Sequence, residues 1–223
     1  MREIVPGIHV IDGLKTGRSY LAEGDDGLCL VDSSTAGVAA RILDAVAQLG
    51  RQPEDLKLIV ATHYHHDHTG NVAELVKRTG AQLAVHSADV PYVEGGERWM
   101  SGRGGLGGLF DAKQYMLSVD RVLNDGDELP FAGGLQVLHA PGHTPGHIAL
   151  YSRARGVLFA GDAFGNWLGL QPPISMYSHD MGLAKQTIQA LAELEFDVAL
   201  PGHGAPVVNR ASEKVAQWAR TWL

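Results

Sequence analysis

Cysteine is almost absent from this chain, since Cys29 is the one cysteine among 223 residues. A single thiol excludes an internal disulfide, and it excludes a closed metal site built from several thiolates. Cys29 belongs to the apolar run of residues 28–31, so we expect it to be a buried apolar side chain rather than a reactive thiol.

Long apolar runs and an excess of positive charge are absent as well. No run approaches the roughly 18 apolar residues of a membrane-spanning helix, and the first residues lack the apolar core of a signal peptide. The 18 Lys and Arg against 25 Asp and Glu give a formal net charge of −7 at pH 7. These absences predict a cytoplasmic protein whose partners include neither a membrane nor a nucleic acid.

Histidine, in contrast, is abundant, and its densest group is the segment Thr-His-Tyr-His-His-Asp-His at residues 62–68. The apolar run of residues 58–61 before it has the length of a buried strand, so His63 and His65 would point to the same side and could share one ion. The chain then turns through Asp67 into a helix-like stretch at residues 72–76. Asp67 suits the N-terminal end of that stretch, so Asp67 and His68 could face a second ion. The segment therefore predicts a site for two metal ions.

Three further potential ligands follow apolar runs later in the chain. His143 follows the run 135–138, Asp162 follows 157–160, and His203 follows 198–200. Loops that Gly and Pro fix at strand ends suit the presentation of a rigid site. Imidazole and carboxylate ligands together suit zinc, iron or manganese.

In this order, the residues resemble the His-x-His-x-Asp-His pattern of the metallo-β-lactamase-fold hydrolases, and the resemblance covers nearly the whole chain. It implies two divalent ions, with zinc as the first choice. The ligand sets that it implies are, for the first ion, His63, His65 and His143; for the second, Asp67, His68 and His203; and for a bridge between them, Asp162. β-Lactamases of the common subclass have cysteine at the position of Asp162, so the aspartate indicates the glyoxalase II and lactonase branch.

The elements expected from periodicity alternate between strands and helices, which by itself shows only a mixed α and β chain. The length and the 45% hydrophobic content fit one domain over residues 1–223. The resemblance implies more, namely an α+β fold of the four-layer αββα sandwich type. The expected strands are 8–11, 20–22, 28–31, 58–61, 82–85, 135–138, 148–151, 157–160 and 198–200, and the expected helices include 38–49, 183–194 and 212–222.

Other polar residues near the motifs receive supporting roles. Asp32 stands at a strand end, and by the same resemblance it supports the metal site. His139 and His147 flank His143 and could orient ligands, since metal-bound imidazoles are commonly held by outer partners. His66 is expected behind the ligands or facing solvent. The remaining histidines are expected to be surface or hydrogen-bonded residues: His9, His86 and His179.

The function expected from the motif is a dinuclear metal-dependent hydrolase that cleaves an ester, thioester or lactone bond. A metal-bridging hydroxide, oriented by Asp67 as the catalytic residue, would attack the acyl carbon. The alternatives are a phosphodiesterase or ribonuclease, which the acidic balance disfavours, a mononuclear iron persulfide dioxygenase, and a non-enzymatic scaffold, which the complete ligand set disfavours. The residues near the motifs that could protonate the leaving group are Tyr64, Tyr177 and His179.

Two long connections should determine the substrate. Residues 95–110 are rich in glycine and include Trp99, and residues 164–177 include Trp167 and follow Asp162 directly. Apolar side chains on loops around a site indicate a pocket for a small-molecule substrate with an apolar acyl part. An interface of a homo-oligomer is the alternative interpretation.

Overall fold

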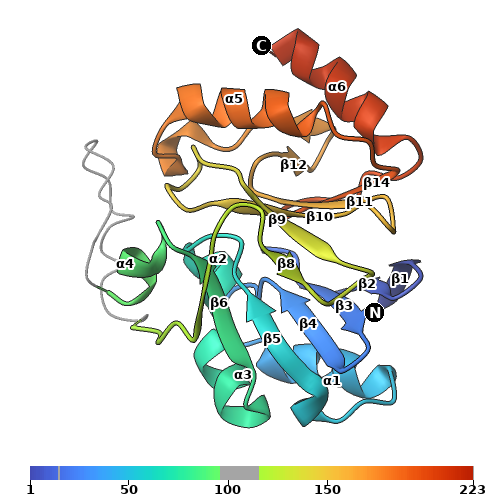
Figure 1. Cartoon of the computed structure of the whole chain (residues 1–223), viewed down its shortest axis with the longest axis vertical. Coiled ribbons are helices and arrows are strands. Elements are labelled where there is room, and N and C mark those ends of the chain that lie inside the picture. The colour runs from blue at the N-terminus through green and yellow to red at the C-terminus, as the bar shows by residue number, and fades with distance from the viewer. Residues whose placement is uncertain (15, 96–115, 223) are drawn as a thin grey trace.

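The computed structural model describes residues 1–14, 16–95 and 116–222 of the chain. They form two β-sheets packed face to face, with helices on the outer side of each sheet (Figure 1). This arrangement confirms the expected αββα sandwich. Among the helices of the described residues, none has the length and apolarity to cross a membrane.

The first sheet contains seven strands in chain order. They are β1 (Arg2–Val5), β2 (Ile8–Val10), β3 (Tyr20–Gly24), β4 (Gly27–Val31), β5 (Leu56–Val60), β6 (Gln82–His86) and β7 (Arg121–Leu123). The pairs from β1 to β4 are antiparallel, whereas those from β4 to β7 are parallel. Parallel strands need crossover connections, and the helices α1 (Ala39–Gln48) and α3 (Val72–Thr79) supply two of them and cover the outer face.

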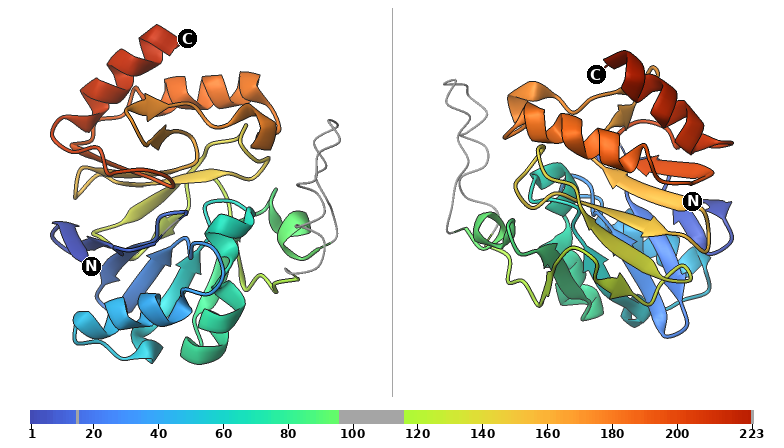
Figure 2. Two further views of the ribbon diagram at one scale, coloured as in Figure 1. Left: turned by 180° about the vertical axis from the view of Figure 1, so that it is seen from behind. Right: turned by 45° about the horizontal axis from the view of Figure 1, so that its top comes forward.

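The second sheet has five strands in the order β14-β11-β10-β9-β8. They are β8 (Glu128–Leu129), β9 (Leu135–His139), β10 (Ile148–Ser152), β11 (Val157–Gly161) and β14 (Val198–Pro201). The helices α5 (Met181–Leu191) and α6 (Ala211–Trp222) lie on the face of this sheet that points away from the first sheet (Figure 2). A separate two-stranded hairpin pairs β12 (Gly165–Asn166) with β13 (Leu170–Gln171).

Several short elements were not expected from the sequence. They include β1, β7, β8, the hairpin β12–β13, and the helices α2 (His66–Thr69) and α4 (Val90–Val93). Elements of two to four residues are too short to display a period, so neither alternation nor helical spacing can reveal them. The 3₁₀ turns Pro53–Asp55 and Ser175–Tyr177 belong to the same class.

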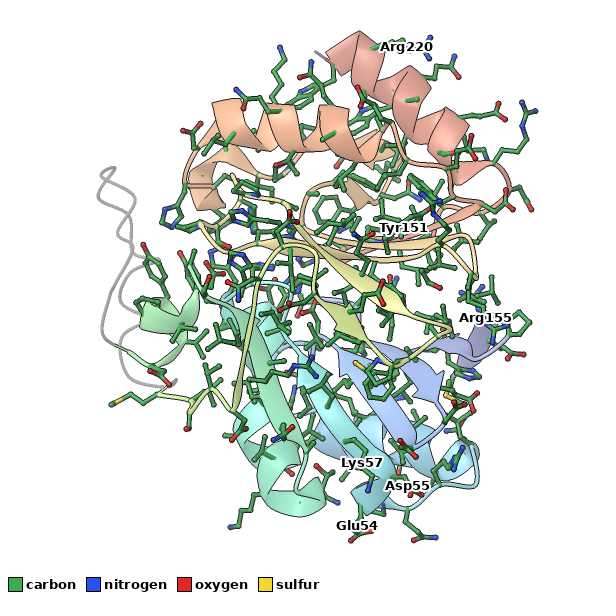
Figure 3. The ribbon with its side chains drawn as sticks, in the orientation of Figure 1. Glu54, Asp55, Lys57, Tyr151, Arg155 and Arg220 are labelled. Atoms are coloured by element: carbon green, nitrogen blue, oxygen red, sulfur yellow. The ribbon has the colours of Figure 1, made fainter. Side chains whose placement is uncertain are left out.

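The core is divided into layers by the alternation of side chains along each strand. In β4, Cys29 and Val31 face the second sheet, whereas Leu28 and Leu30 pack against the helical side. Side chains fill the space between the sheets (Figure 3). Cys29 is fully buried, as expected, and burial raises the pKa of its thiol. The strands of the first sheet thus have an apolar layer packed on each face, which holds the loops at their ends in fixed positions.

Candidate metal centre

The seven predicted ligands converge at one edge of the two sheets. The first four follow β5, with Asp67 and His68 inside the short helix α2. The others follow the ends of β9, β11 and β14 in the second sheet. Residues far apart in the sequence meet in this way when the ends of their strands share an edge. Here the meeting residues are His63, His65, Asp67, His68, His143, Asp162 and His203.

The first group within this centre consists of His63, His65 and His143, each of which offers one atom within 4.8 Å of the others. His65 Nδ1 lies 3.0 Å from His143 Nε2. His63 Nε2 is buried and has no hydrogen-bond partner among the described residues. An unpaired buried nitrogen is costly, and a cation within the group would satisfy it.

The second group consists of Asp67, His68 and His203, again with ligand atoms within 4.8 Å of one another. His203 Nε2 lies 3.2 Å from Asp67 Oδ2 and 3.4 Å from His68 Nε2. The second group differs from the first because one of its three ligands is a carboxylate.

Asp162 lies between the two groups. Its Oδ1 is 3.4 Å from His68 Nε2, and its Oδ2 is 3.4 Å from His143 Nε2 and 3.3 Å from His203 Nε2. Oδ1 is buried and has no hydrogen-bond partner in the described part of the chain. A tetrahedral ion with ligand bonds of about 2.0–2.1 Å keeps its ligand atoms about 3.3–3.4 Å apart. The separations in this centre therefore fit ions in both groups.

The two groups have opposite electrostatics. In the first group, burial holds the pKa of His63 and His143 well below the usual value and lowers that of His65 to about 4. These imidazoles are therefore neutral at pH 7, with lone pairs ready for a cation.

In the second group the carboxylates dominate. Burial opposes protonation of His68, but Asp32, Asp162 and Asp67 raise its pKa to about 9. For His203 burial is likewise outweighed by Asp162 and Asp67, which raise its pKa to about 10. Burial alone would raise the pKa of Asp67 and of Asp162, but the neighbouring histidines hold both below the usual range. A metal ion in this group would have to displace protons.

Asp32 holds the second group from behind. It follows β4 with a positive φ of 59°, and it is 2% exposed. One of its oxygens accepts from the Thr62 N–H at 2.8 Å, and the other contacts the Thr62 hydroxyl at 2.9 Å and His68 Nδ1 at 2.8 Å. Since Nδ1 faces Asp32, Nε2 of His68 is turned toward the centre. The expected support from Asp32 is therefore present.

His147 orients Asp162 through the backbone. Its Nε2 accepts the Asp162 N–H at 2.8 Å, which leaves Nδ1 to donate to the Ala140 carbonyl at 3.0 Å. His139 instead contacts the Pro145 carbonyl at 2.8 Å and touches no ligand in the described residues. The expectation of an orienting role thus holds for His147 only.

The remaining histidines largely follow expectation. His66 is exposed, and His9 is paired with Glu23 at 2.8 Å. His86 stacks on His139 with ring centroids 4.2 Å apart. His179 Nε2 lies 3.0 Å from the Tyr64 hydroxyl, beside the first group.

Sequence reasoning missed Arg18 and Tyr20, which hold the His203 loop. The Arg18 N–H donates to the Gly202 carbonyl at 2.6 Å, and Arg18 Nε donates to the Gly204 carbonyl at 2.8 Å. The Tyr20 hydroxyl donates to the Pro201 carbonyl at 2.7 Å. No local signal marks these residues, because their partners lie more than 180 positions away in the sequence.

Apolar side chains border the second group. Trp167, in the turn of the β12–β13 hairpin, stacks on His203 with ring centroids 5.3 Å apart and an interplanar angle of 26°. Trp167 is 46% exposed and its neighbour Leu168 is 96% exposed. The other exposed apolar residues of the expected 164–177 segment are Ile174, Met176 and Tyr177. Of the expected 95–110 segment only Gly95 lies within the described residues, so Trp99 lies outside them.

Sequence comparison identifies the group of proteins that the chain resembles. Residues 12–203 match the family model of the Metallo-beta-lactamase superfamily. The chain is 30% identical over 203 residues to "Probable metallo-hydrolase YflN" of Bacillus subtilis, covering 81% of this chain and 76% of the relative. It is 32% identical to a hydroxyacylglutathione hydrolase of Methylobacillus flagellatus, over 74% of this chain and 52% of that protein. It is 28% identical to an N-acyl homoserine lactonase of Bacillus sp, over 69% and 57% respectively. The matches to the hydrolase and the lactonase thus span little more than half of those proteins.

Solved structures agree on the fold. A metallo-beta-lactamase family protein from Thermus thermophilus, TTHA1429, superimposes with a TM-score of 0.79 at 24% identity, covering 99% of this chain and 80% of that one. The metallo-beta-lactamase MIM-1 from Novosphingobium pentaromativorans superimposes with a TM-score of 0.76 at 26% identity, covering 99% and 86%.

Proposed function

The chain belongs to the metallo-beta-lactamase superfamily, and we propose that it is a dinuclear metal-dependent hydrolase that cleaves an ester, thioester or lactone bond. The observation that carries the proposal is the pair of ligand groups on either side of Asp162. The first ion would be held by the three histidines of the first group, and the second by the residues of the second group. Zinc is the first choice for both, because three or four N and O ligands at tetrahedral spacing suit it.

The residues around the ions have separate tasks. Two adjacent divalent ions, when bound, supply a polarised acyl oxygen and a water of lowered pKa as nucleophile. His68 and His203 hold the Asp67 carboxylate ionised despite its burial. It would therefore accept a hydrogen bond from the attacking water and orient that water toward the acyl carbon. Asp162, whose oxygens lie 3.3–3.4 Å from histidines of both groups, would contact both ions. Tyr64, whose ring lies 4.7 Å from that of His65, is the candidate to protonate the leaving group.

The choice of bond rests on the relatives and on the site. The named relatives include a lactonase and a hydrolase of an acylated thiol, and both cleave acyl compounds with a leaving oxygen or sulfur. A phosphodiesterase or ribonuclease is disfavoured by the net charge of −7, since binding of nucleic acid depends on basic surface. A mononuclear iron enzyme is disfavoured because one ion needs only one of the two ligand groups, and the other group would then have no role.

The proposed substrate has an apolar acyl part. Trp167 supports this because one face of its indole covers His203 while 46% of the residue is open to solvent. An acyl chain that extends from the reacting carbon could pack on this ring and on the neighbouring exposed side chains. A homo-oligomer that covers the same apolar residues is the competing proposal.

Metal analysis combined with a substrate panel tests the proposed function. Protein purified without added metal should contain two ions per chain, and His65→Ala and His203→Ala should each retain one. The panel should include a thioester, a lactone, a simple ester, a phosphodiester and a β-lactam, the last because of the similarity to MIM-1. Full activity with one tightly bound ion would contradict the dinuclear site, and one iron per chain would favour the oxygenase. Hydrolysis of only the phosphodiester or only the β-lactam would contradict the proposed bond.

A further inference from the structure

A buried carboxylate outside the seven ligand positions contacts both of the segments that carry the first group. Asp89 follows β6, immediately before α4, and is 0% exposed. Its Oδ1 accepts the Gly146 N–H at 2.6 Å. Its Oδ2 accepts the Thr144 hydroxyl at 2.7 Å and the Tyr64 N–H at 3.1 Å.

The three donors come from two segments, one that follows a strand of the first sheet and one that connects strands of the second. Tyr64 lies between His63 and His65 in the segment that follows β5, whereas Thr144 and Gly146 lie beyond His143 in the β9–β10 connection. Asp89 therefore joins the two segments whose histidines form the first group. The approach is close, because a Cβ added at Gly146 would lie 2.4 Å from the Asp89 nitrogen.

The strand order explains why Asp89 has this position. In the first sheet β5 lies between β4 and β6, and all three are parallel, so their carboxyl ends share an edge. Asp32 follows β4 and reaches His68 of the second group. Asp89 follows β6 and reaches the backbone beside His63 and His65. The histidine-rich segment is thus held by one buried carboxylate on each side.

The backbone of Asp89 is held in place by β6, and its side chain is ionised at neutral pH. Its N–H donates to the His86 carbonyl at 2.9 Å, and the ring of His86 stacks on His139 of the second sheet. Burial raises the pKa of Asp89 to about 6, although its three hydrogen bonds and His139 act in the opposite direction. At neutral pH the side chain is ionised, and an ionised acceptor forms the stronger hydrogen bonds.

We propose that Asp89 is a positioning residue for the first metal ion, because it fixes the spacing between the His63–His65 segment and His143. The proposal rests on the dinuclear function proposed above. Asp89 touches no predicted ligand among the described residues and acts through the backbone of Tyr64 and the Thr144–Gly146 turn. It therefore sets the affinity of the first ion and leaves that of the second unchanged.

Asp89→Asn is the sharpest test of this role, because it keeps the shape and removes one acceptor. An amide has one accepting oxygen and one donating nitrogen. The Thr144 hydroxyl can turn to accept from the amide, but the N–H groups of Tyr64 and Gly146 cannot. One of those two N–H groups must then lose its acceptor.

Two single-site backgrounds separate the ions. In His203→Ala the remaining ion lies in the first group, and in His65→Ala it lies in the second. Zinc affinity in each background is measured by competition with a chromophoric chelator, with and without Asp89→Asn. We expect a loss of about 10- to 100-fold in the His203→Ala background. In the His65→Ala background we expect no change.

A matched control and a milder variant complete the design. Asp120→Asn alters another aspartate that accepts a backbone N–H, that of Leu83 at 2.8 Å, at the opposite end of β6, and it should change neither affinity. Thr144→Val removes a single hydrogen bond to Asp89 and should lower the affinity for the first ion by about 2- to 10-fold. It serves as the test if Asp89→Asn does not fold.

The outcomes distinguish this proposal from the function on which it rests. Equal weakening in both backgrounds, or no change in either, would overturn the positioning role of Asp89 while the dinuclear site stands. If the unchanged protein binds one zinc ion per chain instead of two, the dinuclear function fails, and the role of Asp89 at a first ion fails with it.

Discussion

Replacement of Trp167 by alanine tests how this enzyme would select its substrate. The indole stacks on His203 at 5.3 Å, and 46% of the residue is exposed beside the second group. Trp167→Ala removes this apolar surface without removing a predicted ligand. We therefore expect both ions to remain bound and the change to appear in substrate preference.

The size of the effect follows from the buried area. Each CH₂ that a substrate buries is worth about 0.8 kcal/mol, or about fourfold in kcat/KM. A chain that lays three methylenes along the ring would gain about 2.4 kcal/mol if fully buried. One ring supplies only one wall of a pocket, so about half of this gain, about 1.2 kcal/mol, should be lost. The variant should then be about eightfold poorer with a long acyl chain and nearly unchanged with an acetyl ester.

The assay compares kcat/KM for a series of thioesters and esters of increasing acyl length. Trp222→Ala is the matched control, since that ring stacks on Trp218 in α6, on the outer side of the second sheet. The slope of log kcat/KM against chain length should fall in Trp167→Ala and stay constant in Trp222→Ala. An equal loss for short and long substrates, or a change in oligomeric state alone, would refute the reasoning and favour an interface.

Three further predictions concern the metal centre. Asp162→Ala should lower the occupancy of both ions and abolish most of the activity, because its two oxygens face both groups; metal analysis that finds both ions retained would contradict its bridging position. Gly202→Ala should destabilise the protein by about 1–3 kcal/mol in chemical denaturation, because the added Cβ would lie 2.2 Å from Asp162 Oδ1; an unchanged midpoint would contradict the close approach. Zinc binding to the second group should release up to two protons at pH 7, because the raised pKa values of His68 and His203, about 9 and about 10, keep both protonated there. The affinity of the second group for zinc should rise with pH and level off above about pH 10. Proton release is measured by calorimetry in buffers of different ionisation enthalpy, and a result of no release would contradict the protonation of His68 and His203.

The elements that could be predicted from the sequence are those with a strong local pattern. Residues 212–222 were expected as a helix and form α6 (Ala211–Trp222), because amphipathic spacing over three turns is a local property. The hairpin β12–β13 could not be predicted in the same way, since strands of two residues have no period. Its position matters for function, because it carries Trp167 against His203.

The candidate site divides along the same line. The gathering of its seven residues could be predicted, because four of them lie in one motif and the other three follow apolar runs that end in Gly and Pro turns. The residues that hold the ligands could not, because each acts through a contact that only the sheet order creates. Arg18 reaches Gly204 across 186 positions, and Asp89 reaches Gly146 across 57. A buried side chain that binds backbone N–H groups needs no particular partner residue, so its role leaves no motif in the sequence. The positions of such residues follow instead from the topology. Once the parallel strands are ordered β4-β5-β6, polar side chains that follow β4 or β6, such as Asp32 and Asp89, lie beside the segment that follows β5.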